Sequence, residues 1–295
     1  MITQLFNKGR LLRVLFCSSF CAFVTLPVSA ADQPPLQMEQ VSGDVWMISG
    51  GGYANISVLA GEGRALMVDS KRADLYEDIS AMVREISGGD AEYLINGHVH
   101  PDHTDGNENF GLAGAKIIAH EEVRRVLLAG QRGGPPAPAA AIPEVLITDG
   151  GSLELRFDGE IVRVIHMPPA HSLGNVMVHY VNANVLHMGD LYSPERFPVI
   201  AGGTVEGFIE ANMTVFNMAD GATRYIAGNG EVTRKAQHGT YIGMVTTVRD
   251  RVARMIAEGM SEEEVIAARP AEEFEGTYGD PGRFLPALYR ELAGQ

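Results

Sequence analysis

The stretch Asn96-Gly97-His98-Val99-His100-Pro101-Asp102-His103-Thr104-Asp105-Gly106 decides how this chain is interpreted. Three histidines and one carboxylate lie between His98 and His103. Neutral imidazole and carboxylate groups are ligands that suit Zn²⁺ and similar divalent metals. Pro101 argues against a helix interior, and the apolar residues 93–95 before the stretch are typical of a short buried strand. The pattern predicts a metal-binding loop that leaves a strand; a polar surface loop is the alternative.

The spacing His98-x-His100-x-Asp102-His103 resembles the signature of the metallo-β-lactamase superfamily. In that family the first two histidines bind one zinc ion, and the aspartate and the last histidine bind a second. The resemblance implies an α/β fold of four layers, an αβ/βα sandwich of two mixed β-sheets flanked by helices. It also implies a zinc-dependent hydrolase with one or two Zn²⁺ ions per chain.

Later segments supply the remaining ligands in the order that the family has them. His171 lies in an Ala-His-Ser-Leu-Gly element, where the family has Gly-His-Thr-x-Gly and the third histidine of the first zinc site. Asp190 follows Gly189 at the end of a predicted strand and matches the carboxylate that bridges the metals or binds the second one. By the same resemblance Asp69 orients a ligand, with a plain turn residue as the alternative. The implied metal ligands are therefore His98, His100, His171, Asp102, His103 and Asp190, and Asp102 is also the implied catalytic residue.

One position departs from the family pattern. The family has Gly-His-Gly where this chain has Gly228-Asn229-Gly230, and the missing histidine would complete the second zinc site. An amide oxygen is a poorer zinc ligand than an imidazole nitrogen. We therefore expect a weakened second site, with Asn229 as a second-site or substrate contact. His238 is an alternative ligand, although its position predicts a place on the next helix.

The N-terminus has the pattern of a cleaved signal peptide. Lys8, Arg10 and Arg13 form a basic region, residues 14–26 are mostly apolar, and small residues precede a predicted cleavage after Ala30. We expect residues 1–30 to be a signal peptide, residues 31–295 to be a single domain, and the mature protein to be periplasmic or secreted without stable membrane insertion. An uncleaved membrane anchor is the alternative. Both cysteines lie in residues 1–30, so the mature chain would have no disulfide and no thiolate ligand.

Charge restricts the partners. The formal net charge is −14, and removal of residues 1–30, which hold three basic residues and no acidic one, would change it to −17. Such acidity argues against nucleic acid or an anionic membrane as a partner. The expected partner is a small-molecule substrate.

Apolar periodicity predicts the elements around these motifs. Strands are expected at residues 45–48, 56–59, 65–68, 93–95 and 115–118, then as a meander at 144–148, 153–157 and 161–166, and finally at 175–180, 184–187 and 224–227. Helices are expected at 75–86, 205–219, 241–257 and 283–292, with a short one opened by Ser261. The segment 131–143 is rich in Gly, Pro and Ala and is either a rim over the site or a surface connection. His120 is expected at a helix start and His166 in a structural role.

Three functional hypotheses follow from these features. The first is a zinc-dependent hydrolase that acts on β-lactam amide bonds, since an exported enzyme would meet those antibiotics. The second is a hydrolase of another small ester, lactone or thioester, because one fold hosts many substrates. The third is an accessory metal-binding protein with a degraded second zinc site. The presence of His98, His100, His171, Asp102 and Asp190 argues against the third.

Overall fold

The structure is a computed structural model that describes residues 33–52 and 54–295. Residues 34–295 form one compact unit. The predicted signal peptide lies outside the described residues. Within the described ranges, no helix has both the length and the apolar content needed to cross a membrane.

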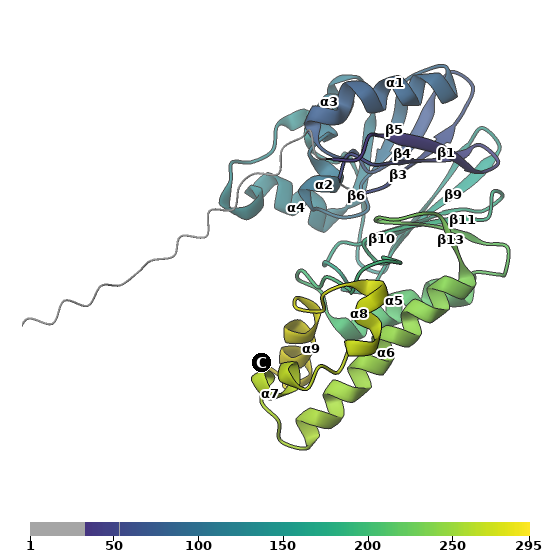
Figure 1. Cartoon of the computed structure of the whole chain (residues 1–295). Coiled ribbons are helices and arrows are strands. Elements are labelled where there is room, and N and C mark those ends of the chain that lie inside the picture. The colour runs from purple at the N-terminus through teal and green to yellow at the C-terminus, as the bar shows by residue number, and fades with distance from the viewer. Residues whose placement is uncertain (1–32, 53) are drawn as a thin grey trace, which may run out of the picture. The chain divides into compact units, whose positions relative to one another are not determined.

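Two mixed β-sheets form the centre of this unit (Figure 1). In the described residues the first sheet has seven strands in sequence order, antiparallel from β1 to β4 and parallel from β4 to β7. They are β1 (Gln37–Ser42), β2 (Val45–Ser49), β3 (Ile56–Ala60), β4 (Ala65–Val68), β5 (Ala91–Ile95), β6 (Lys116–His120) and β7 (Val145–Ile147).

The second sheet has six strands in the order β13-β12-β11-β10-β9-β8 among the residues described. Its strands are β8 (Ser152–Phe157), β9 (Glu160–His166), β10 (Val176–Tyr180), β11 (Val185–Gly189), β12 (Arg224–Ala227) and β13 (Thr233–Arg234). The pair β11–β12 is parallel, and the other pairs are antiparallel. The expected meander is therefore wrong in its first strand, because β7 pairs with β6 in the first sheet.

The apolar side chains on the two faces of each strand separate into layers. In β4, Leu66 and Val68 pack with Val176 and Val178 of β10 between the sheets, whereas Met67 packs on the opposite face with the helices. Met177 of β10 likewise packs into a core with the helices that cover the second sheet. This alternation is what strands buried on both faces require.

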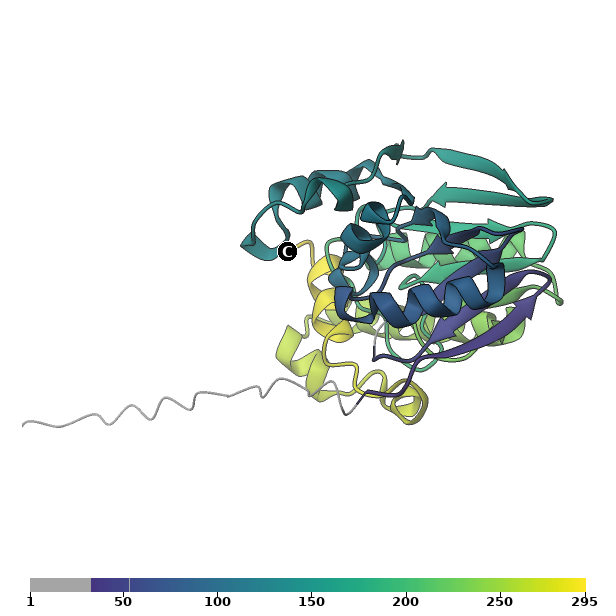
Figure 2. The ribbon, with the colours of Figure 1, turned by 90° about the horizontal axis from the view of Figure 1, so that it is seen from above.

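Helices cover both outer faces (Figures 1 and 2). On the first sheet lie α1 (Tyr76–Ser87) and α3 (Asn107–Leu112), and on the second lie α5 (Val205–Met218) and α6 (Lys235–Ala257). The remaining helices are α2 (Pro101–Thr104), α4 (Glu121–Ala129), α7 (Glu262–Ala267), α8 (Glu275–Tyr278) and α9 (Phe284–Leu292), with short 3-10 turns at Ala73–Leu75, Gln131–Gly133, Ala139–Ala141 and Glu272–Phe274. The layer order confirms the expected αβ/βα sandwich.

The expectation that the whole metal-binding stretch is a loop is wrong, because Pro101 begins a helical turn. It is the first residue of α2, so Asp102 and His103 lie in that turn rather than in an irregular loop. The first residue of a helix needs no amide hydrogen, and the fixed φ of proline suits it. Proline therefore excludes a helix interior here but permits a helix start.

Candidate metal centre

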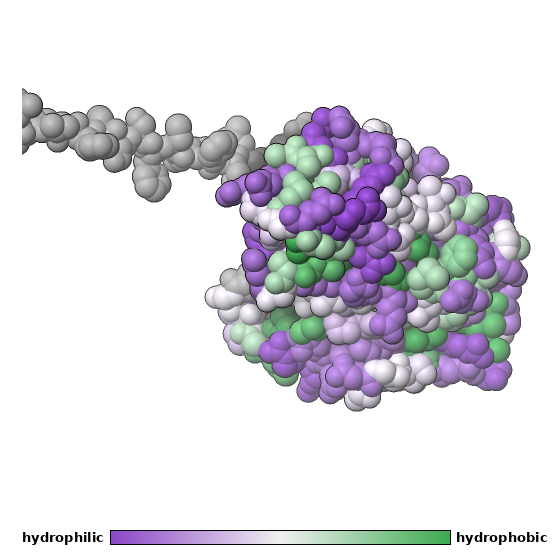
Figure 3. Space-filling model, turned by 90° about the horizontal axis from the view of Figure 1, so that it is seen from below, coloured by the Kyte–Doolittle hydropathy of each residue, from purple (hydrophilic) through white to green (hydrophobic). Residues whose placement is uncertain are grey.

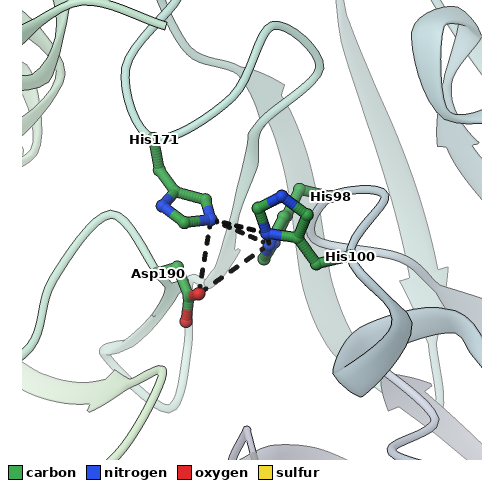
Figure 4. A group of neighbouring side chains, drawn as sticks. All are labelled: His98, His100, His171 and Asp190. Carbon is green, nitrogen blue, oxygen red and sulfur yellow. Dashed lines mark hydrogen bonds and ion pairs between the residues drawn. The ribbon is translucent and has the colours of Figure 1, made fainter. Parts of the chain in front are cut away.

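Four groups from both sheets converge on one point (Figure 4). His98 and His100 follow β5, His171 lies between β9 and β10, and Asp190 follows β11. One ligand atom from each of the four lies within 4.8 Å of all the others. Strands end here in both sheets, so residues far apart in the sequence meet at one edge of the sandwich.

The three imidazoles face each other through ring nitrogens. His171 Nε2 is 3.1 Å from His98 Nε2 and 2.8 Å from His100 Nδ1, and the last two atoms are 2.9 Å apart. His171 Nδ1 is 2.6 Å from the carbonyl oxygen of Val199 and donates to it, which leaves a bare lone pair on Nε2. In a tetrahedral zinc site with Zn–N bonds of about 2.0–2.1 Å, the ligand nitrogens are only slightly farther from one another than these three nitrogens are. The three nitrogens thus fit one metal ion.

The protonation state of these three histidines also suits metal binding. Burial and the neighbouring His103 and His171 lower the pKa of His98 well below its usual value. Burial and the same neighbours lower the pKa of His100 to about 4. Burial likewise lowers the pKa of His171. All three imidazoles are therefore neutral near pH 7, which is the form that binds metals.

A second group consists of Asp102, His103 and Asp190. His103 Nε2 is buried and has no hydrogen-bond partner, and it lies 3.5 Å from Asp190 Oδ1 and 3.7 Å from Asp102 Oδ2. The two carboxylates are its more accessible members, with 25% of the Asp190 side chain and 34% of the Asp102 side chain exposed. Two carboxylates and one imidazole nitrogen that face a common point are suited to a second cation, which would take the place of the imidazole proton.

Asp69 orients His103, as the resemblance implied. Asp69 is fully buried after β4, and its Oδ2 lies 2.7 Å from His103 Nδ1, while its Oδ1 accepts from the amide of Gly97. Burial works against the charged form of Asp69, but the charge of His103 lowers the pKa of this carboxyl to about 2. Since His103 Nδ1 donates to the carboxylate, Nε2 is the ring nitrogen that faces Asp102 and Asp190. Burial opposes the charged form of His103, but the charges of Asp69 and Asp190 raise its pKa well above the usual value, so a cation would have to displace the Nε2 proton. His187, 3.5 Å from Asp69 Oδ2, joins the same buried network.

Asn229 lies in the turn after β12, next to the metal centre. Gly228 packs so closely on Asp190 that a Cβ atom there would collide with Asp190 Oδ1. The Oδ1 atom of Asn229 accepts a 2.9 Å hydrogen bond from Ser193, which engages one of its two lone pairs. The side chain thus has a partner within the protein, and the imidazole and carboxylate groups described at the second site are those of Asp102, His103 and Asp190.

His238 does not replace the missing histidine. It lies on α6, is fully buried, and its Nε2 is 2.8 Å from Asn212 Oδ1. Its ring packs beside Tyr192 and Tyr225 in the core under the second sheet. The expected place of His238 on the following helix is confirmed.

A further histidine pair lies outside the metal centre. His120 accepts a hydrogen bond from the Glu122 amide at the start of α4, and His166 accepts one from the Gly150 amide. Their rings are stacked 4.1 Å apart at 14°, near Asp149. One ligand atom from each of His120, His166 and Asp149 lies within 4.8 Å of the others, so this group could also hold an ion, although the Nδ1 atoms of both rings already accept backbone amides. The expected place of His120 at a helix start is confirmed.

Several contacts at the centre had no signal in the sequence. The Val199 carbonyl that holds His171 is a backbone group, which any residue supplies. Ser193, which binds Asn229, lies in an unremarkable loop. A serine three residues after a candidate ligand does not by itself predict such a contact.

The metallo-beta-lactamase superfamily model matches residues 49–243 of this chain. A curated relative, the alpha subunit of 2,4-dinitroanisole O-demethylase from Nocardioides sp. (strain JS1661), is 25% identical over 160 residues, which cover 54% of this chain and 47% of that protein. The chain thus matches about half the length of that relative.

Solved structures share the fold. A metallo-beta-lactamase from Pontibacter korlensis has a TM-score of 0.61 at 14% identity and covers 72% of this chain and 99% of its own. The DIM-1 metallo-beta-lactamase has a TM-score of 0.61 at 19% identity, covering 73% and 99%. A double mutant of the sec-alkyl sulfatase PisA1 has a TM-score of 0.70 at 15% identity, covering 88% of this chain and 50% of its own. At these identities the likeness shows the fold alone.

Proposed function

The chain belongs to the metallo-beta-lactamase superfamily, and on this premise we propose that it is a zinc-dependent hydrolase of a small molecule. The observation that carries the proposal is the convergence of His98 Nε2, His100 Nδ1 and His171 Nε2 on one point beside Asp190. Three protein ligands leave a coordination position for water or substrate, as in catalytic rather than structural zinc sites.

We assign the first ion to His98, His100 and His171, and a second, weaker site to Asp102, His103 and Asp190. Zinc would supply Lewis acidity and lower the pKa of water from near 16 to about 7. Asp69 holds His103 in the tautomer that such a site needs. Asp102 is the most exposed carboxylate of the group, so we assign it the transfer of a proton between water and the leaving group.

Two substrate classes are proposed. The first is the β-lactam amide bond, since the predicted export would place the enzyme where β-lactams act. The second is a small ester or ether, a class favoured by the curated relative, whose name describes an O-demethylase for 2,4-dinitroanisole. Both classes need attack of water on an electrophilic centre.

The test is hydrolysis by the protein of residues 31–295 with added zinc and then with chelator. A chromogenic cephalosporin, 4-nitrophenyl acetate and 2,4-dinitroanisole distinguish the substrate classes. We expect turnover of at least one probe that chelator abolishes and zinc restores. The His171→Ala variant should lose it, whereas His179→Ala, a strand histidine outside the ligand groups, should keep it. Turnover that survives chelator, or that His171→Ala retains, would overturn the zinc-dependent mechanism.

A further inference from the structure

Lys71 is a buried cation close to the metal centre. It lies two residues after Asp69, and 0% of it is exposed. Its Nζ atom donates to the carbonyl oxygen of Gly50 at 3.0 Å and to that of Ala54. Both carbonyls belong to the connection between β2 and β3. Burial of an ammonium group is costly unless its hydrogens are bonded, and the two carbonyl acceptors offset part of that cost here.

The backbone of Lys71 contacts the metal-binding stretch. Its carbonyl oxygen accepts from the Gly106 amide at 3.0 Å, and the neighbouring Ser70 amide donates to the His103 carbonyl oxygen at 3.0 Å. Lys71 and Asp69 both have left-handed backbone angles, with φ of 53° and 67°. Non-glycine residues adopt this conformation at a cost, which suits a segment held in place by its surroundings.

Asn55 extends these contacts to the Asn229 turn. Its amide donates to the Gly228 carbonyl oxygen at 2.8 Å, and its Nδ2 donates to the carbonyl oxygens of Ala227 at 3.1 Å and Gly230 at 2.9 Å. Gly228 in turn lies against the proposed ligand Asp190. These hydrogen bonds, together with the covalent bonds from Ser70 to Lys71 and from Ala54 to Asn55, connect the metal-binding stretch to the turn beside Asp190.

We propose that Lys71 is a positioning residue of the metal centre: its buried ammonium group, together with Asn55, holds α2 and the turn at residues 228–230 in register around the second metal site. This inference rests on the proposed zinc-dependent function. It matters more here than in a complete site, because Asn229 replaces the histidine ligand and the remaining three residues alone fix the second ion.

The charge state of Lys71 is compatible with this role. Burial lowers the pKa of Lys71 to about 8, while the charges of Asp69 and Asp102 oppose the decrease. The ammonium form therefore predominates at pH 7, with three hydrogens to donate.

Lys71→Met is the test, with Lys71→Arg as the conservative variant and Lys116→Met as the control, because Lys116 is an exposed lysine of β6. Zinc affinity is measured by competition with a chromogenic chelator, and unfolding temperature by circular dichroism. We expect Lys71→Met to weaken the second zinc affinity about ten-fold, as loss of groups that orient ligands does. The first zinc affinity should change less than about three-fold, because Lys71 makes no contact with His98, His100 or His171 in the bonds described.

The outcomes distinguish a positioning role of Lys71 at the metal centre from a role in the stability of the fold alone. Partial restoration by Lys71→Arg, with Lys116→Met unchanged, supports the proposal. A lower unfolding temperature with wild-type zinc affinities would overturn it, since Lys71 would then be structural. If Lys71→Met does not fold, Asn55→Ala decides: the same selective loss supports the inference, and unchanged affinities overturn it. These readouts need no substrate, so failure of the hydrolase proposal would appear separately, as a wild-type protein that binds zinc without turnover.

Discussion

Asn229 lies beside the proposed second metal site, where the resembled family has a histidine. Its oxygen accepts from Ser193, and the proposed second site consists of a carboxylate pair and His103. We predict that Asn229→His raises the zinc content at micromolar zinc from nearer one to nearer two ions per chain, because imidazole is the better ligand. Metal analysis after gel filtration measures this change.

Ser193→Ala is the matched control for this variant. It removes the hydrogen bond to Asn229 but adds no imidazole, so zinc content should remain at the wild-type value. Equal zinc content in Asn229→His and wild type would mean that position 229 does not reach the metal.

His238 gives a pH-dependent contribution to stability outside the metal centre. Burial lowers its pKa from the usual 6.5 to about 3. Above about pH 6.5 the residue is neutral in both states; below it the unfolded chain binds a proton that the folded protein does not bind until about pH 3. The contribution of His238 to the free energy of unfolding is therefore fully present above pH 6.5 and is lost as the pH falls towards 3.

His238→Gln should reduce this pH dependence. The free energy of unfolding, measured in urea with chelator present, should fall with pH less steeply in the variant, by up to about 1.4 kcal/mol per pH unit between about 6.5 and 3. Chelator removes any contribution from metal release. Parallel curves for the two proteins would show that His238 takes up its proton at an ordinary pH in the folded state.

Residue types at the metal centre were predictable from sequence, but their supports were not. His98, His100, Asp102 and His103 lie in one compact motif, and the structure brings them together with His171 and Asp190. Lys71 and Asn55 act through backbone carbonyls, which every residue has. No residue type or spacing marks such an acceptor before the chain is folded.

Among the connections, the start of segment 131–143 is attached to the metal-binding stretch. Gln131 Nε2 donates to the Val99 carbonyl oxygen at 2.6 Å and lies 3.3 Å from Thr104 Oγ1. These contacts favour a rim at the site over a plain surface connection. We predict that Gln131→Ala lowers the free energy of unfolding by about 1 kcal/mol, the usual net value of such bonds, and also lowers kcat.

Gln40→Ala controls for the loss of a side-chain bond as such. Gln40 donates to the Gly43 carbonyl oxygen at an exposed hairpin of the first sheet. Urea unfolding measures the loss of stability in both variants, and the hydrolysis assay should show a lower kcat for Gln131→Ala alone. An equal effect of both variants on kcat would count against the rim.

The elements with strong local patterns were predictable, and those decided by distant partners were not. The capping box at Ser261 opens α7 as expected, and the hairpin of β10 and β11 is confirmed. The pattern at residues 144–148 correctly predicted a strand but not its sheet, since β7 pairs with β6. Strand β1, which pairs with β2, was not predicted, because four of its six residues are polar.

On the scale of the whole molecule, the proposed metal ligands come from both sheets. His98, His100, Asp102 and His103 follow the first sheet's β5, and His171 and Asp190 follow strands of the second. A bound ion would therefore connect the two halves of the sandwich in addition to the apolar core between the sheets.

The face in Figure 3 carries small hydrophobic groups dispersed among hydrophilic ones rather than one broad apolar area.

Metal removal should therefore destabilise the whole domain. An ion at about 1,000 times its Kd stabilises the folded state by about 4 kcal/mol, which corresponds to a shift in Tm on the order of 10 °C for a domain of this size. We expect chelator to lower the Tm by that amount and zinc to restore it, as measured by circular dichroism. In His171→Ala the first site keeps its ligands from the first sheet but loses the histidine that reaches it from the second. Its Tm should respond to zinc much less than that of the wild type. A Tm that chelator leaves unchanged in the wild type would mean that the apolar core alone holds the two sheets together.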